Sequence, residues 1–72
     1  MKKFVVTAES DLVEVETRTN DIEVALDLFE GLSKDTDYFS IDLIDGETGE
    51  VYAYQRVLRD PWGVTVTRWV AI

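Results

Sequence analysis

Serine hydroxyls and carboxylates are the side chains of this sequence that could take part in catalysis, and the groups that would activate them are missing. The 72 residues include no His and no Cys, so Ser10, Ser33 and Ser40 have no imidazole base to deprotonate them. None of the three lies in a G-x-S-x-G context. Residues 46–49 (GETG) match neither a Walker loop nor a dinucleotide fingerprint. A glycosidase-type carboxylate pair needs a deep cleft, which we do not expect in so short a chain. We predict no catalytic residue, no bound cofactor and no enzyme activity.

Carboxylates could instead offer oxygen ligands to Ca²⁺. The candidate groups are Asp35 with Asp37, and Asp42 with Asp45 and Glu47. Neither group has the spacing of an EF-hand loop, and zinc sites built on Cys or His are excluded by composition. We interpret these carboxylates as solvated turn residues and expect no metal site.

The acidic residues are concentrated in the middle of the chain. Residues 9–50 hold fourteen of the fifteen acids and two bases, a net charge of −12, whereas the two flanks together carry +4. The whole chain has a charge of −8 and a pI near 4.2. Such a balance disfavours direct binding to nucleic acid, whose protein partners are normally basic.

Five of these acids are candidates for binding a partner. They share faces of two predicted elements, a helix with Glu23, Asp27 and Glu30 and a strand with Glu14 and Glu16. Two interpretations stay open. The acids are a solubility surface, or they dock on a basic protein surface, including the nucleic-acid channel of another protein.

The elements that would position these residues follow from hydrophobic periodicity. Strands are expected over residues 2–8, 12–18, 38–44, 50–58 and 64–71, with turns at residues 9–11, 45–49 and 60–63. A helix is expected after Asn20, which we take as its N-cap, with Glu23 completing a capping-box-like pair. Its core stripe is Ile22, Ala25, Leu26, Phe29 and Leu32, and the polar residues 33–37 end it.

The order β-β-α-β-β-β predicts an α+β fold, a single antiparallel sheet with one helix packed on one face. We expect one compact domain over residues 1–72. The apolar content of 46% argues against disorder, and no apolar run is long enough to span a membrane. Without Cys there is no disulfide framework, so the cytoplasm is the expected compartment.

Aromatic residues are expected on the face of the sheet that the helix does not cover. If the strand phases are right, this face holds Tyr38, Tyr52, Tyr54 and Trp69, with Ile44 beside them. Two interpretations again stay open. The last strand folds over and buries these rings, or they form a contact surface, for example in a homodimer.

The length, acidity, lack of Cys and element order resemble small proteins of bacteriophages and other mobile elements that inhibit host defence, of which the anti-CRISPR proteins are the best-known group. Residues 45–52 (DGETGEVY) also resemble a hairpin found in small bacterial and phage proteins. The resemblance implies an inhibitor that occupies the DNA-binding surface of a host effector in the bacterial cytoplasm. These inhibitors share no common motif, so the resemblance assigns no role to any residue.

Our expectation is therefore a non-enzymatic protein-binding module that docks an acidic surface on a basic, nucleic-acid-binding surface of a host protein complex. The alternative is a small structural or oligomerising module that associates through the aromatic face of its sheet. Neither function involves direct contact with nucleic acid or with a membrane.

Overall fold

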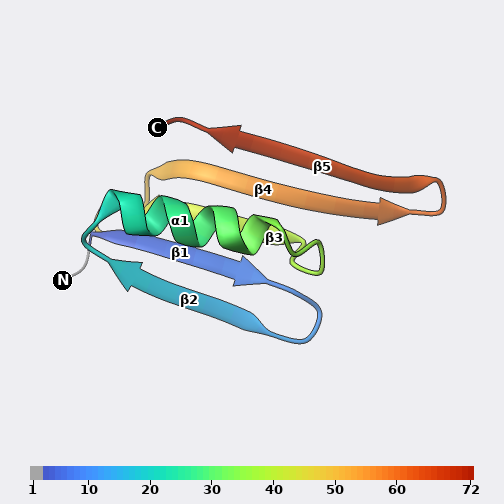
Figure 1. The fold of residues 1–72 in the computed structure, drawn as a ribbon, viewed down its shortest axis with the longest axis horizontal. Helices are drawn as coiled ribbons and strands as arrows, with labels where there is room; N and C mark the ends of the chain where they lie inside the picture. Colours follow the sequence, from blue (N-terminus) through green and yellow to red (C-terminus); the bar gives the residue numbers. More distant parts are fainter. Residues whose placement is uncertain (1–2) are drawn as a thin grey trace.

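The computed structural model describes residues 3–72 and confirms the predicted α+β fold. Its elements are β1 (Phe4–Glu9), β2 (Glu14–Thr19), α1 (Ile22–Ser33), β3 (Ser40–Asp45), β4 (Val51–Asp60) and β5 (Gly63–Val70). The strands form one antiparallel sheet in the order β2-β1-β3-β4-β5. Helix α1 lies across β1, β2 and β3, while β4 and β5 extend beyond it (Figure 1). The first predicted strand begins at residue 2, which is outside the described residues.

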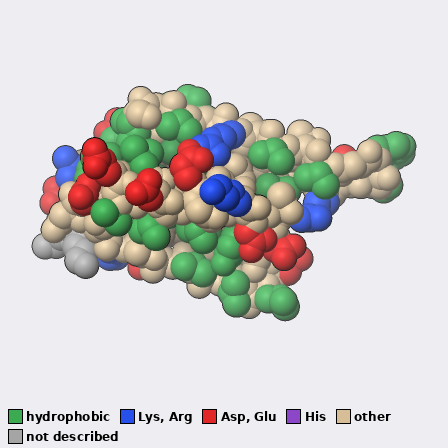
Figure 2. Space-filling view, in the orientation of Figure 1, with side chains coloured by type: hydrophobic (Ala, Val, Ile, Leu, Met, Phe, Trp, Pro, Cys, Tyr) green, Lys and Arg blue, Asp and Glu red, His purple; other side chains and the backbone are tan. Residues whose placement is uncertain are grey.

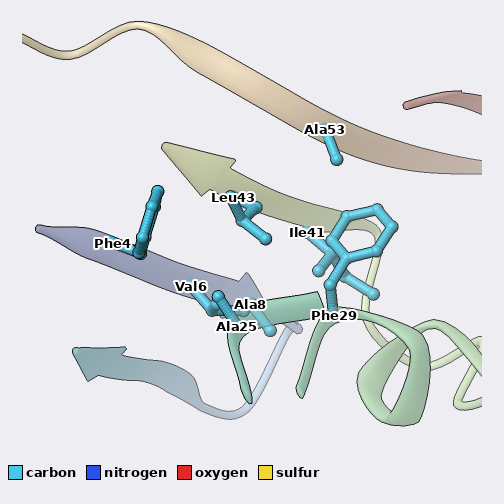
Figure 3. Close-up of a cluster of buried hydrophobic side chains, with 8 residues drawn as sticks. All are labelled: Phe4, Val6, Ala8, Ala25, Phe29, Ile41, Leu43 and Ala53. Atoms are coloured by element: carbon cyan, nitrogen blue, oxygen red, sulfur yellow. The ribbon is translucent and has the colours of Figure 1, made fainter. Parts of the chain in front are cut away.

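The core lies between α1 and one face of the sheet. Alternate residues of β1 and β3, including Val6 and Leu43, point toward Ala25 and Phe29 of the helix (Figure 3). All four of these side chains have no exposed surface. The remaining members of this core are Phe4, Ala8, Ile41 and Ala53. The predicted helix stripe is thus confirmed in Ala25 and Phe29, and the strand expected over residues 38–44 buries Ile41 and Leu43.

The N-cap of the helix lies one residue later than we predicted. Asp21 is the N-cap, and its carboxylate accepts the backbone N–H of Glu23 at 2.9 Å. The side chain of Asn20 instead accepts the backbone N–H of Lys3 at 2.9 Å. Asn and Asp cap helices about equally well, so sequence alone could not choose between these neighbours. The cap prediction at Asn20 was therefore wrong, and Asn20 ties the start of the helix to the start of β1.

The register between β3 and β4 shifts between Leu43 and Ile44, so that Leu43 pairs with Ala53 but Ile44 pairs with Val51. Tyr52 is the extra residue of this irregularity. Its ring packs edge-on against Phe4, with centroids 5.8 Å apart. The shift therefore places Tyr52 beside the core rather than on the uncovered face of the sheet, where we expected it.

The β4–β5 hairpin has longer strands than the β1–β2 hairpin and is the part of the sheet least covered by the helix. A two-residue turn, Pro61 and Trp62, joins the strands, and the carboxylate of Asp60 accepts the N–H of Trp62 at 2.8 Å. Gly63 closes the turn with φ of 149°, a conformation that residues with a side chain rarely adopt. Every residue of β5 is exposed. The idea that the last strand folds over and buries the rings is wrong, because β5 forms the edge of the sheet.

Candidate interaction surfaces

The five predicted partner-binding acids lie on two opposite sides of the molecule. Glu23, Asp27 and Glu30 occupy the outer side of α1, away from the sheet; we call these three residues the acidic helix face. On β2, Val15 packs against the core, so its neighbours Glu14 and Glu16 project from the opposite face of the sheet. The helix and the sheet therefore separate the two groups, and no single surface contains all five.

Acidic side chains gather over α1 in the space-filling view, with basic side chains beside them (Figure 2). Glu23 and Asp27 are exposed, and neither makes an ion pair within the described part of the chain. Glu30 differs, because its carboxylate is bonded to the guanidinium of Arg68. Two of the three acids in the acidic helix face are therefore exposed to solvent without an ion-pair partner among the described residues.

The basic residues near the end of the chain pair with acids of the other elements. Arg56 bonds Asp42 at 2.9 Å across the β3–β4 pair, and Arg59 lies 3.7 Å from Asp37. With Arg68 on Glu30, all three arginines of the hairpin are engaged. The contrast between the acidic middle and the basic flanks therefore serves in part as an internal contact between the hairpin and the rest of the fold.

Three side chains hold the hairpin to the end of α1 and the loop that follows it. The amide of Gln55 donates to the carbonyl of Ser33 at 3.2 Å. Arg59 donates to the carbonyl and the hydroxyl of Thr36 at 2.8 and 2.9 Å. Arg68 donates to Glu30 and to the Ser33 hydroxyl, and its guanidinium lies 5.2 Å above the ring of Phe29. These contacts fix the direction in which β5 runs, although no side chain of β5 is buried.

Within residues 3–72, Asp45 and Tyr52 are the bonded side-chain pair in which both groups have a shifted pKa. Backbone N–H groups of Glu47 and Thr48, 2.8 and 3.1 Å away, hold the pKa of Asp45 below its usual range, and the Tyr52 hydroxyl adds a bond at 2.9 Å. The same bond raises the pKa of Tyr52. Because all partners of Asp45 belong to the β3–β4 turn and its flank, this arrangement closes a turn rather than preparing a reactive group.

The four predicted aromatic residues do not share one face. Tyr38 and Tyr52 pack against the core cluster, whereas Tyr54 and Trp69 stack on each other with centroids 5.8 Å apart. The guanidinium of Arg56 covers the ring of Tyr54 at 5.3 Å. The prediction of a continuous aromatic face was wrong for Tyr38, which precedes the strand, and for Tyr52, which sits at the register shift.

Exposed apolar residues of the hairpin form a surface that the sequence analysis did not single out. Val64, Val66 and Val70 are 53%, 50% and 40% exposed, and they lie on the same face of the sheet as Arg68 and α1, beyond the part that the helix covers. Trp62, at the tip, is 91% exposed, and apolar side chains mark the protruding end of the hairpin (Figure 2). The alternation of valine was visible in the sequence, but nothing in it showed that β5 would be an edge strand.

A hollow of ≈ 550 Å³ lies between the β1–β2 turn and the loop after α1. It is lined by Ser10, Asp11, Leu12, Val13, Asp35, Asp37, Tyr38 and Arg59. Its one basic side chain, Arg59, is already bonded to Thr36. Within residues 3–72 no three acidic side chains are grouped so that they could hold a metal ion.

The described residues contain no helix that is both long and apolar enough to cross a membrane. Comparisons with protein-family models, with curated proteins and with solved structures found no match.

Proposed function

We propose that this chain is a non-enzymatic protein-binding module whose contact surface is the β4–β5 hairpin. One observation carries the proposal: β5 is eight residues long, belongs to the sheet, and is exposed along its whole length. A strand of this kind offers a row of unpaired backbone groups to another chain. Addition of a strand to such an edge is a common mode of peptide and protein recognition.

The two edges of the sheet differ in a way that supports this assignment. Natural proteins blunt exposed edges with charges, prolines and bulges. Strand β2 carries Glu14, Glu16 and Arg18, whereas β5 has one charged residue, Arg68, whose side chain lies over α1. Strand β5 also contains no proline, and its register with β4 is continuous. The chain thus protects one edge and leaves the other ready for pairing.

The acidic helix face supports a second candidate function, docking on a basic, nucleic-acid-binding surface of a host protein complex. The specific observation is that Glu23 and Asp27 are exposed and make no ion pair within residues 3–72. Such a surface would accelerate association with a basic partner and would lose its effect as salt rises. Glu14 and Glu16, on the other side, would not join the same contact.

Site-specific photocrosslinking in cells that naturally express the chain separates the two candidates. A photoreactive phenylalanine derivative replaces either Thr65 on β5 or Asp27 on α1, both of which are exposed. The hairpin proposal predicts adducts from Thr65 and none from Asp27. Adducts from Asp27 alone, lost at high salt, would support docking through the acidic helix face. The absence of adducts from Thr65 would contradict the hairpin proposal.

A further inference from the structure

We infer that the occupant of the β5 edge is a second copy of this chain, paired antiparallel to β5 about a two-fold axis at Thr67. The inference rests on the proposed contact function of the hairpin and names its partner. Two copies joined in this way would form one continuous ten-stranded sheet, twice the five strands of each chain.

The hydrogen bonds of the hairpin define which backbone groups of β5 are unpaired. The N–H of Ala71 donates to Tyr52, and the N–H of Val57 donates away from β5, to Phe39. Hydrogen-bonded and non-bonded pairs alternate in an antiparallel ladder. The register of β4 and β5 therefore shows which residues of β5 bond to β4 and which point their backbone groups away from it. The backbone groups that point away from β4 are those of Val64, Val66, Arg68 and Val70, which we call the free edge.

A two-fold axis at Thr67 pairs the complete free edge with itself. Val64 then lies opposite Val70 of the second copy, and Val66 opposite Arg68. These are four bonded pairs, or about eight backbone hydrogen bonds. No like charges face each other directly. Shifting the register by two residues in either direction leaves free-edge groups without partners.

The same register brings together exposed apolar residues outside the strand. Trp62 at the tip is as far before Thr67 as Ile72 is after it, so each Trp62 would lie beside Ile72 of the second copy. These residues are 91% and 54% exposed in the single chain. Their burial on association removes apolar surface from water at two places symmetrically related by the axis.

The charge distribution permits two chains of net charge −8 to associate at this edge. The free edge contains one charge, Arg68, and its guanidinium is bonded to Glu30 of its own chain. The acids of β2 lie at the far edge, four strand spacings or about 19 Å from β5. The repulsion between these acids and the second copy is therefore weakened by distance and by salt.

Sedimentation equilibrium of the purified chain tests the partner directly. The average mass should rise with concentration from 8.2 kDa toward twice that value. Val66→Lys places a charge on the free edge and should keep the chain monomeric at the same concentrations. Val13→Lys is the matched control, because Val13 is 53% exposed against 50% for Val66 and lies away from β5. It should associate like the original chain.

Single cysteines test the register, since the chain has no other Cys. Thr67→Cys should form an intermolecular disulfide under mild oxidation, because its Cα lies about 4.5 Å from its copy in a non-bonded pair. Thr65→Cys should not, because the two copies of residue 65 are separated by four residues of strand, about 13 Å.

A purified chain that stays at 8.2 kDa at all concentrations would overturn the inference, as would equal crosslinking at positions 65 and 67. The purified chain could be monomeric and yet form adducts with a different protein from Thr65 in cells. That result would overturn the pairing with a second copy and leave the proposed contact function of the hairpin in place. No adducts in cells, together with a monomeric purified chain, would remove both.

Discussion

Replacing Arg68 by Met should loosen the hairpin without disturbing its backbone. The side chain of Arg68 reaches from the exposed strand β5 to Glu30, to the Ser33 hydroxyl at 3.3 Å and over the ring of Phe29. An exposed ion pair contributes about 0.2–1 kcal/mol, and a cation over an aromatic ring about 0.5–1 kcal/mol. Methionine keeps much of the apolar stem and removes both polar terms. We expect the free energy of unfolding to fall by about 0.7–2 kcal/mol, the sum of these two contributions.

Urea unfolding followed by tryptophan fluorescence measures this loss, at a protein concentration low enough to keep the chain monomeric. With a slope of about 1 kcal/mol per molar urea, typical of a small domain, the midpoint should fall by about 0.7–2 M. Arg18→Met is the matched control, since the bond that Arg18 makes within residues 3–72 is to Glu16 on its own strand, at 3.4 Å. It should change stability by less than about 0.5 kcal/mol. Equal effects of the two substitutions would refute the role given to Arg68.

Three further predictions concern the fold. Gly31→Ala should raise the free energy of unfolding by about 0.5–1 kcal/mol in chemical denaturation, because Gly31 lies in α1 with open space where a Cβ would stand; a loss of stability would contradict the helix assignment. The lowered pKa of Asp45 makes its stabilising contribution complete above its unfolded pKa, near 3.8, and progressively lost as pH falls through the folded value. The stability gap between the original chain and Asp45→Asn should therefore narrow in acid, and a constant gap down to pH 2 would refute this. Because the pKa of Tyr52 is raised, its hydroxyl contributes stability fully below its unfolded pKa, near 10, and this contribution is lost as pH rises through the folded value. Alkaline unfolding should therefore cost Tyr52→Phe less stability than it costs the original chain.

The fold could be predicted because the apolar residues of each element recur at the spacing of a helix or of a strand. The alternation of Ile41 and Leu43 along β3 and the spacing of Ala25 and Phe29 along α1 identify the buried faces. Short turns between successive strands favour antiparallel pairing. The order of strands was not predicted, and it decides that β2 and β5 are the edges of the sheet.

The candidate surfaces could be predicted only in part, because they depend on tertiary geometry. The three acids of α1 share a face as their helical spacing requires, but sequence could not show that Glu14 and Glu16 lie on the opposite side of the molecule. One register shift removed Tyr52 from the expected aromatic face. The exposure of β5 follows from the length of the hairpin beyond the helix, which no local pattern records.

Hydrogen exchange of the β5 amides as a function of protein concentration reports whether the free edge pairs with a second copy. In the single chain, the N–H groups of Thr65, Thr67 and Trp69 point toward β4 and are protected, while those of the free edge are not. If two copies pair along the free edge, the protection of the Val64, Val66, Arg68 and Val70 amides rises with concentration, and that of the alternate residues changes little. Free-edge amides that exchange rapidly at every concentration would contradict this pairing.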